Sequence, residues 1–249
     1  MFEFFTTISS RLWKGLLPIV VKNSYIISSG SVHPKVILIT KGRSGRMNCR
    51  LELGRITYKN DVQMKIAAHC AQVFAGVKPS NAVTLDREET ISLTQALKDT
   101  GIQYRLLYAD AKRCVWLLYR EQDLEQYLMK REHQIFMRDC GYDSVQLNDM
   151  FTVFCKNYWE YKNGRKGFPH ELGLILGYPL CDVKGFIRHQ GHSYLFSGYW
   201  KVYGNPEDTR KRFEVYNLVR YQIIKQVQHK KPLAQIAASY TNYRIHKQY

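Results

Sequence analysis

Residues 168–179 read FPHELGLILGYP, and this stretch predicts two short helices on either side of a sharp turn. Pro169 suits the first turn of a helix, because its backbone nitrogen has no hydrogen to donate there. The first helix runs through apolar positions to Gly177, which can close it in a left-handed conformation. Pro179 restarts the chain, and residues 182–190 predict the second helix. We expect this stretch to lie at the centre of the folded domain.

The chain before this stretch alternates between helical and strand patterns. Apolar residues recur every four positions over residues 62–74, which predicts a helix with one apolar face. Residues 103–108 and 114–119 are rich in β-branched, leucine and aromatic residues and flank a short polar turn, so they predict a hairpin. The remaining predicted segments before residue 168 are a strand at 82–85 and helices at 86–101, 121–140 and 144–159.

The chain after this stretch adds one strand and one long helix. Residues 194–203 predict the strand, and the helix begins at Asn205, a good N-cap followed by Pro206, and ends before Pro232. Helices and strands are interleaved, which favours an α/β fold, with a mixed α+β arrangement as the alternative. We expect a small mixed sheet of about four strands with a central hairpin, covered by roughly six to seven helices.

The distribution of charge divides the chain into three parts. Of its net charge of +16, residues 1–60 hold 10 Lys/Arg and 2 Asp/Glu, and residues 210–249 hold 9 Lys/Arg and 1 Glu, so the middle is neutral. We expect a basic, poorly ordered extension over residues 1–60 with one short strand at 35–40. A single globular domain follows over residues 61–230, and a polar basic tail over residues 231–249. Basic ends can bind polyanions weakly, although solubility alone also explains them.

Cysteine spacing and hydropathy indicate a cytosolic protein. The six cysteines form no CxxC pair, which argues against a zinc knuckle or an iron–sulfur ligand run and favours reduced core residues. No stretch approaches the ~20 apolar residues needed to cross a membrane. The hydrophobic fraction of 45% excludes wholesale disorder. We therefore expect a cytoplasmic location.

Six runs of the sequence carry a resemblance to a known family. They read CAQVFAGVKPS at 70–80, CVWLLYR at 114–120, FPHE at 168–171, LGYP at 176–179, DVKGF at 182–186 and GYWKVY at 198–203. The sequence resembles an uncharacterised bacterial family, found largely in clostridia, that is marked by its PHE and LGYP motifs. The resemblance covers residues 61–228 and names a domain of unknown function. It implies no particular activity.

His170 and Glu171 are the candidate catalytic residues. A histidine can exchange a proton near neutral pH, and a glutamate can orient it or act as a base. Neighbouring helical positions point about 100° apart, so the pair cannot share one face as in an HExxH metal site. At a helix N-terminus, His170 could act as an acid beside a bound anion. The alternative is that Glu171 favours the helix dipole and His170 makes a structural hydrogen bond.

Six other residues are candidates for ligand binding, because they are polar or cationic and lie at predicted turns, strand ends or motifs. They are Lys78, Ser80, Arg120, Tyr178, Lys184 and Lys201. Four of them also have a structural alternative: a solvated turn for the first two, a pairing with a helix carboxylate for Arg120 and a packed ring for Tyr178. Lys201 lies in an aromatic and basic strand that could stack bases, and Lys184 lies in the DVKGF run.

These candidates leave three functional hypotheses open. The first is a small enzyme or binding protein for an anionic small molecule, with His170 and Glu171 at the site. The second is a nucleic-acid-associated or regulatory protein that uses its basic ends. The third is a metal- or haem-linked protein, because His189 and His192 lie close together in sequence. The sequence names no cofactor and no oligomeric state.

Overall fold

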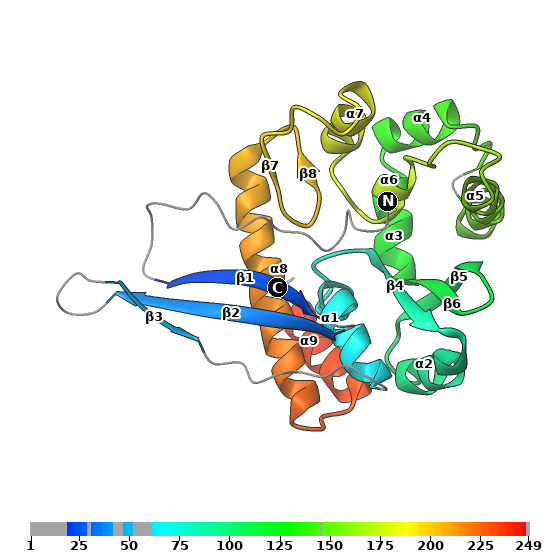
Figure 1. Cartoon of the computed structure of the whole chain (residues 1–249). Helices are drawn as coiled ribbons and strands as arrows, with labels where there is room; N and C mark the ends of the chain where they lie inside the picture. The colour runs from blue at the N-terminus through cyan, green and yellow to red at the C-terminus, as the bar shows by residue number, and fades with distance from the viewer. Residues whose placement is uncertain (1–18, 29–30, 42–46, 52–60, 145, 248–249) are drawn as a thin grey trace.

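The computed structural model describes residues 19–28, 31–41, 47–51, 61–144 and 146–247, and side chains from residue 61 to 240 apart from 145. In chain order the elements are β1 (Ile19–Ser28), β2 (Ser31–Lys41), β3 (Met47–Leu51), α1 (Val62–Phe74), β4 (Ser80–Asp86), the 3₁₀ turn Arg87–Glu89, α2 (Thr90–Leu97), β5 (Gln103–Ala109), β6 (Arg113–Tyr119), α3 (Glu121–Leu128), α4 (Arg131–Asp139), α5 (Leu147–Lys162), α6 (Leu172–Ile175), α7 (Leu180–Arg188), β7 (Phe196–Ser197), β8 (Lys201–Val202), α8 (Pro206–Gln228) and α9 (Leu233–Lys247). The expected mixture of helices and strands is confirmed in its α+β form (Figure 1).

The central sheet is antiparallel and has the strand order β4-β6-β5. The predicted hairpin is β5–β6, and its turn is held by the Asp110 carboxylate, which accepts the backbone N–H groups of Lys112 and Arg113 at 2.8 Å each. β4 joins the other edge of β6, with Ser80 opposite Tyr119. This sheet has three strands rather than about four, because the strand expected at 194–203 does not join it.

The segment 194–203 instead folds back on itself as the small hairpin β7–β8. The Gly198 N–H donates to the Trp200 carbonyl at 3.0 Å inside the turn. A Cβ at position 198 would lie 2.2 Å from the ring of Phe213, so a glycine is needed for the turn to rest on α8. The strand expected at 194–203 is therefore interrupted by a turn at Gly198 that packs closely on α8.

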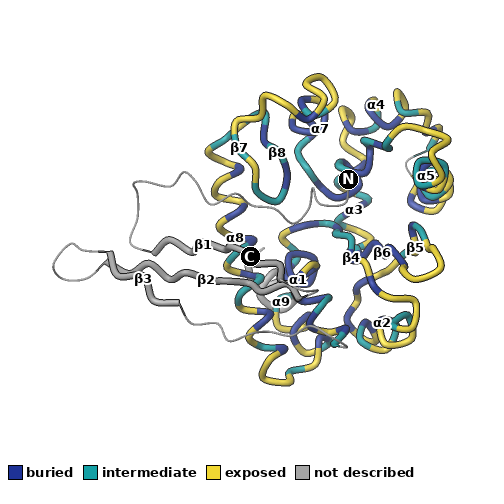
Figure 2. Tube along the Cα trace, viewed as in Figure 1, coloured by how far each residue is buried: buried dark blue, intermediate teal, exposed yellow. Residues whose placement is uncertain are grey.

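Strand β6 separates two hydrophobic clusters, because its side chains alternate between the two faces of the sheet. Cys114, Trp116 and Leu118 face a cluster built with α1, α2, α8 and α9. Val115 and Leu117 face a second cluster built with α3 to α7. Buried residues accordingly follow β6 and the inner faces of these helices (Figure 2).

The C-terminal segment corrects one expectation. We predicted a polar tail from residue 231, but residues 233–247 form α9, and its Leu233, Ile236 and Ala237 are buried in the cluster with α1. These three residues lie three and four positions apart, so they share one helical face. The hydrophobic core therefore continues past Pro232.

The N-terminal part contains an antiparallel sheet of β1, β2 and β3 in that order. The short strand expected at 35–40 lies within β2. Residues 1–18, 29–30, 42–46 and 52–60 lie outside the described residues, and with them most of the extension that we expected to be poorly ordered. Within the described chain, no helix has the length and apolar character of a membrane span.

Candidate functional site

Two segments that are far apart in sequence meet beside β4. Ser80 donates its hydroxyl hydrogen to the Ile175 carbonyl at 2.5 Å. Gly177 has a φ of 73°, and a Cβ there would lie 2.6 Å from Pro79 Cγ. Residues 78–80 and 175–178 are thus packed face to face, and we call this contact the junction. It confirms that the LGYP run makes a sharp turn and shows what the turn packs against.

Tyr178 completes the junction with its ring and its backbone. Its ring stacks on Trp200 at 4.8 Å between centroids. Its carbonyl accepts a hydrogen bond from the Tyr127 hydroxyl at 2.6 Å, which ties the turn to α3. Burial raises the pKa of the Tyr178 phenol. Tyr178 is therefore a packed, buried ring.

Lys78 is a buried lysine, with 2% of its surface exposed. Its Nζ donates to the Asn81 Oδ1 at 2.8 Å and lies 5.0 Å from the centroid of the Tyr178 ring. Burial lowers the pKa of Lys78 to about 7, against a smaller opposing effect of the Cys70 thiol. Burial also raises the pKa of that thiol to about 12. The Lys78 amine therefore loses its proton at a lower pH than a solvent-exposed lysine does.

Arg120 supports the junction from the end of β6. Its Nε and Nη2 donate to the carbonyls of Val73 and Phe74 at 2.8 and 3.0 Å, where α1 ends. Its backbone N–H donates to the Pro79 carbonyl at 2.9 Å. The guanidinium satisfies carbonyls that a helix C-terminus leaves without intrahelical donors. These contacts give Arg120 a structural role.

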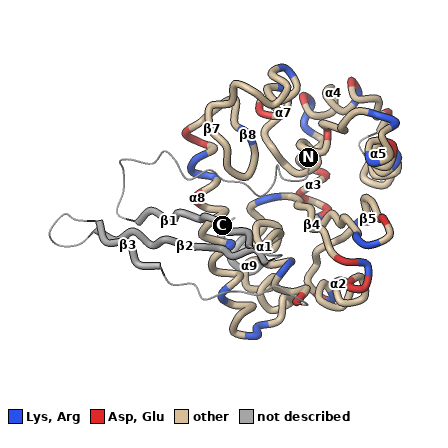
Figure 3. The backbone as a smooth tube through the Cα atoms, in the orientation of Figure 1, with Lys and Arg blue, Asp and Glu red and all other residues tan. Residues whose placement is uncertain are grey.

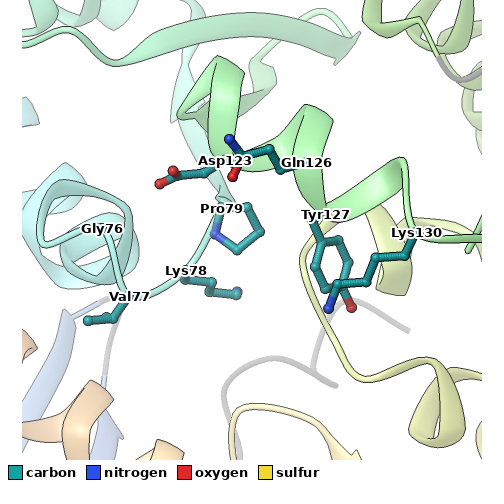
Figure 4. Close-up of a pocket in the computed structure, with 8 residues that line it drawn as sticks. All are labelled: Gly76, Val77, Lys78, Pro79, Asp123, Gln126, Tyr127 and Lys130. Atoms are coloured by element: carbon teal, nitrogen blue, oxygen red, sulfur yellow. The ribbon is translucent and has the colours of Figure 1, made fainter. Parts of the chain in front are cut away.

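A pocket of about 280 Å³ opens beside the junction, between the end of α1 and helix α3 (Figure 4). It is lined by Gly76, Val77, Lys78, Pro79, Asp123, Gln126, Tyr127 and Lys130. We call it the Lys78 pocket. Lys130 is exposed, and its Nζ lies 5.3 Å from the centroid of the Tyr127 ring. The pocket thus has the exposed Lys130 ammonium in its lining, whereas the Lys78 amine is buried against Asn81 and Tyr178, which do not line it.

The residues that α3 contributes were missing from our sequence analysis. Asp123, Gln126 and Tyr127 of α3 are spaced by three and one positions, which is the spacing of one helical face. Lys130 follows the end of α3, at the N-cap of α4. That polar face was visible in the sequence. Its position opposite Lys78 was not, because it depends on how α3 packs against the junction.

His170 and Glu171 lie in the turn before α6. The contacts described for them are with residues that do not line the Lys78 pocket. Glu171 is buried, and its Oε1 accepts from the Tyr142 hydroxyl at 2.9 Å. The His170 ring lies 5.4 Å from that of Phe168 and 5.6 Å from that of Phe186, and burial lowers its pKa. The helix that was expected to begin at these residues is α6, which has only four residues.

The two remaining lysine candidates belong to the region of α7 and β8. Lys184 is exposed on α7. Lys201 donates from Nζ to the Gly191 carbonyl at 2.7 Å and lies 4.8 Å from the centroid of the Tyr194 ring. Next to them the buried Asp182 accepts from Trp200 Nε1 at 2.7 Å. The structure therefore joins Lys78, Ser80, Arg120 and Tyr178 around the junction and places Lys184 and Lys201 in a different set of contacts.

The other two hypotheses gain no support from the described side chains. Between residues 61 and 240, no group of three His, Cys, Asp or Glu residues could hold a metal ion, and His189 stacks on Tyr203 at 5.6 Å. In the described part of the chain, Lys and Arg are interspersed with Asp and Glu (Figure 3). Polyanion binding through the basic ends stays a prediction, because the side chains of residues 1–60 lie outside the described ones.

Comparisons with known proteins identify the family. No curated protein matches the chain, and no solved structure does. A family described as "Protein of unknown function (DUF3793)" matches residues 66–237, which include the junction, the Lys78 pocket and the first residues of α9. A bacterial and largely clostridial origin remains what the resemblance implies. The chain belongs to the DUF3793 family.

Proposed function

We propose that this protein binds a small anionic molecule in the Lys78 pocket. The observation that carries the proposal is the exposed Lys130 ammonium, which lines the same pocket as the Gln126 amide. Ligand pockets typically measure about 300–1,000 Å³. A volume of about 280 Å³ therefore suits a ligand of few heavy atoms.

Charge and hydrogen-bond donors in the lining favour an anion. The Lys130 ammonium is exposed and can meet an entering carboxylate or phosphate group. The Gln126 amide can donate to a ligand oxygen. Asp123 lies in the same lining and would repel an anion placed against it, which favours a binding position on the Lys130 side.

The pH dependence of binding follows from the buried amine. A bound anion favours the protonated form of a neighbouring lysine. Because burial holds the pKa of Lys78 at about 7, the amine gains its charge as the pH falls through 7. Anions whose own charge is constant over this range, such as lactate and pyruvate, should therefore bind more tightly at pH 6 than at pH 8.

Catalysis by His170 and Glu171 is a separate proposal that binding does not require. Glu171 already accepts from Tyr142, and His170 packs between two aromatic rings. A catalytic role would require a ligand that reaches those rings. Conversion of a bound ligand that is lost in His170→Gln, while binding persists, would support it.

Titration of the full chain with small anions tests the proposal. Phosphate, pyruvate, lactate and citrate are added separately, and binding is followed by calorimetry and by the rise in melting temperature. Lys130→Gln should weaken binding about tenfold, equivalent to ~1.4 kcal/mol. Lys98→Gln, at the exposed end of α2, is the matched control and should bind as the wild type does. Equal affinities of all three proteins for every anion would refute the proposed site.

A further inference from the structure

The lining of the Lys78 pocket carries charges of both signs. Asp123 brings a carboxylate from the first turn of α3, where its side chain is half-buried, and Lys130 brings an exposed ammonium group from the N-cap position of α4. A ligand with only a negative charge can pair with Lys130 but is repelled by Asp123. A ligand that carries an ammonium group as well as a carboxylate can pair with both.

The two charged groups are separated along the pocket. Asp123 and Lys130 are seven positions apart in sequence, which corresponds to about 10 Å along a helix axis. In Figure 4, Pro79 lies between their side chains. The Lys130 Nζ lies 5.3 Å from the centroid of the Tyr127 ring, so this side chain turns back toward α3. A ligand that reaches both groups therefore needs opposite charges at its two ends.

The part of the lining between the two charges offers apolar surface. It includes the rings of Pro79 and Tyr127 and the exposed side chain of Val77. Methylene groups of a ligand would leave water against these surfaces, which favours binding. The Gln126 amide lies on the same helical face as Asp123 and can accept from an ammonium group or donate to a carboxylate. The lining therefore matches a short methylene chain with a charged group at each end.

We propose, on the basis of the proposed anion site, that the anionic group is the carboxylate of a small ω-amino acid. Its carboxylate pairs with Lys130, and its ammonium group pairs with Asp123. Hydrogen bonds of about 3 Å at the two ends leave about 4 Å of the span for the separation of the ligand's own charges. β-Alanine and γ-aminobutyrate have a separation of this order, whereas the two charged groups of glycine share one carbon atom.

A matched pair of ligands tests this inference. γ-Aminobutyrate and butyrate have the same carbon chain and the same carboxylate, and they differ in the ammonium group. Calorimetry with the full chain at pH 7 and low salt measures both affinities. We expect γ-aminobutyrate to bind about five- to tenfold more tightly than butyrate and also more tightly than glycine. Equal affinities for γ-aminobutyrate and butyrate would overturn the inference, and glycine binding as tightly as γ-aminobutyrate would overturn the end-to-end arrangement.

The variant Asp123→Asn removes the charge that should select the ammonium group. The preference for γ-aminobutyrate should disappear, and butyrate should bind at least as tightly as before, because a repulsive carboxylate is lost. Asp143→Asn, at an exposed position, is the matched control and should keep the preference. A preference that Asp123→Asn leaves unchanged would contradict the proposed contact. If Asp123→Asn does not fold, the comparison of the ligands in the wild type decides alone.

The same titrations distinguish this inference from the proposed function. If butyrate binds, Lys130→Gln weakens its binding and γ-aminobutyrate has no advantage, the anion site stands and the ω-amino acid is refuted. If neither ligand binds, and lactate and phosphate do not bind either, both proposals fail. An advantage of γ-aminobutyrate that depends on Asp123, together with weaker binding of both ligands to Lys130→Gln, supports both proposals.

Discussion

Replacing Gly177 with alanine tests the contact on which the junction depends. Gly177 has a φ of 73°, where a residue with a Cβ costs about 1–2 kcal/mol. The new methyl group would also lie 2.6 and 2.7 Å from Cγ and Cδ of Pro79. Overpacking of this kind costs about 1–3 kcal/mol. We expect Gly177→Ala to lower the free energy of unfolding by about 2–5 kcal/mol.

The matched control is Gly164→Ala, because Gly164 has a φ of 69° with nothing within 4 Å of the position of a Cβ. It should cost only the backbone part, about 1–2 kcal/mol. Urea denaturation followed by tryptophan fluorescence and far-UV circular dichroism measures both variants. Pro79→Ala removes the ring atoms that clash, so Gly177→Ala should cost less in that background. A cost for Gly177→Ala no larger than for Gly164→Ala, or unchanged by Pro79→Ala, would contradict the described packing.

Three further predictions concern stability. Because the pKa of Lys78 is lowered to about 7 in the folded state, the unfolded chain binds more protons above pH 7, and stability should rise with pH. Relative to Lys78→Met, the free energy of unfolding of the wild type should rise by about 2 kcal/mol between pH 7 and 9 in urea titrations. If the free energies of the two proteins change in parallel over this pH range, the prediction is wrong. Asp182→Asn should lower the free energy of unfolding by about 2–4 kcal/mol and alter the near-UV circular dichroism of Trp200. The reason is that the Asp182 carboxylate accepts hydrogen bonds from Trp200 Nε1 and from the backbone N–H groups of Tyr203 and Gly204. The control Asp143→Asn, at an exposed position, should change neither quantity. Arg120→Lys should lower the free energy of unfolding by about 1–3 kcal/mol in the same assay, because one ammonium group cannot replace the planar guanidinium that donates to two carbonyls. An equal loss for Arg113→Lys, at an exposed position, would argue against this role of Arg120.

Local patterns predicted most helices and the hairpin, because those elements depend on neighbours in sequence. The four-residue apolar repeat of α1 and the paired runs of β5 and β6 are examples. The pairing of β4 with β6 brings Ser80 opposite Tyr119 and could not be inferred from periodicity. The hairpin at Gly198 depends on the Phe213 ring of a different element, so its strand pattern was misleading.

In the candidate site, too, the sequence predicted features that depend on neighbouring residues but not contacts between distant segments. Lys78, Ser80 and Tyr178 were singled out for their residue types at turns, each with a local alternative. The hydrogen bond from Ser80 to Ile175 joins residues 95 positions apart, and nothing in either turn predicts it. Gln126 and Tyr127 were missed because a polar helical face is ordinary until its partner is known.

The chemistry of Lys78 is therefore a consequence of the junction. In sequence, Lys78 lies in a turn that would be expected to be solvated, and the segment 175–178 contributes the covering Tyr178 ring. Burial is the largest cause of its lowered pKa, so a change that opens the junction should return that pKa toward its ordinary value near 10. Gly177→Ala should accordingly move the titration midpoint of Lys78, followed by NMR, well above 7, and Gly164→Ala should leave it in place. A loss of stability with no movement of that midpoint would assign the burial of the amine to α1 and β4 instead.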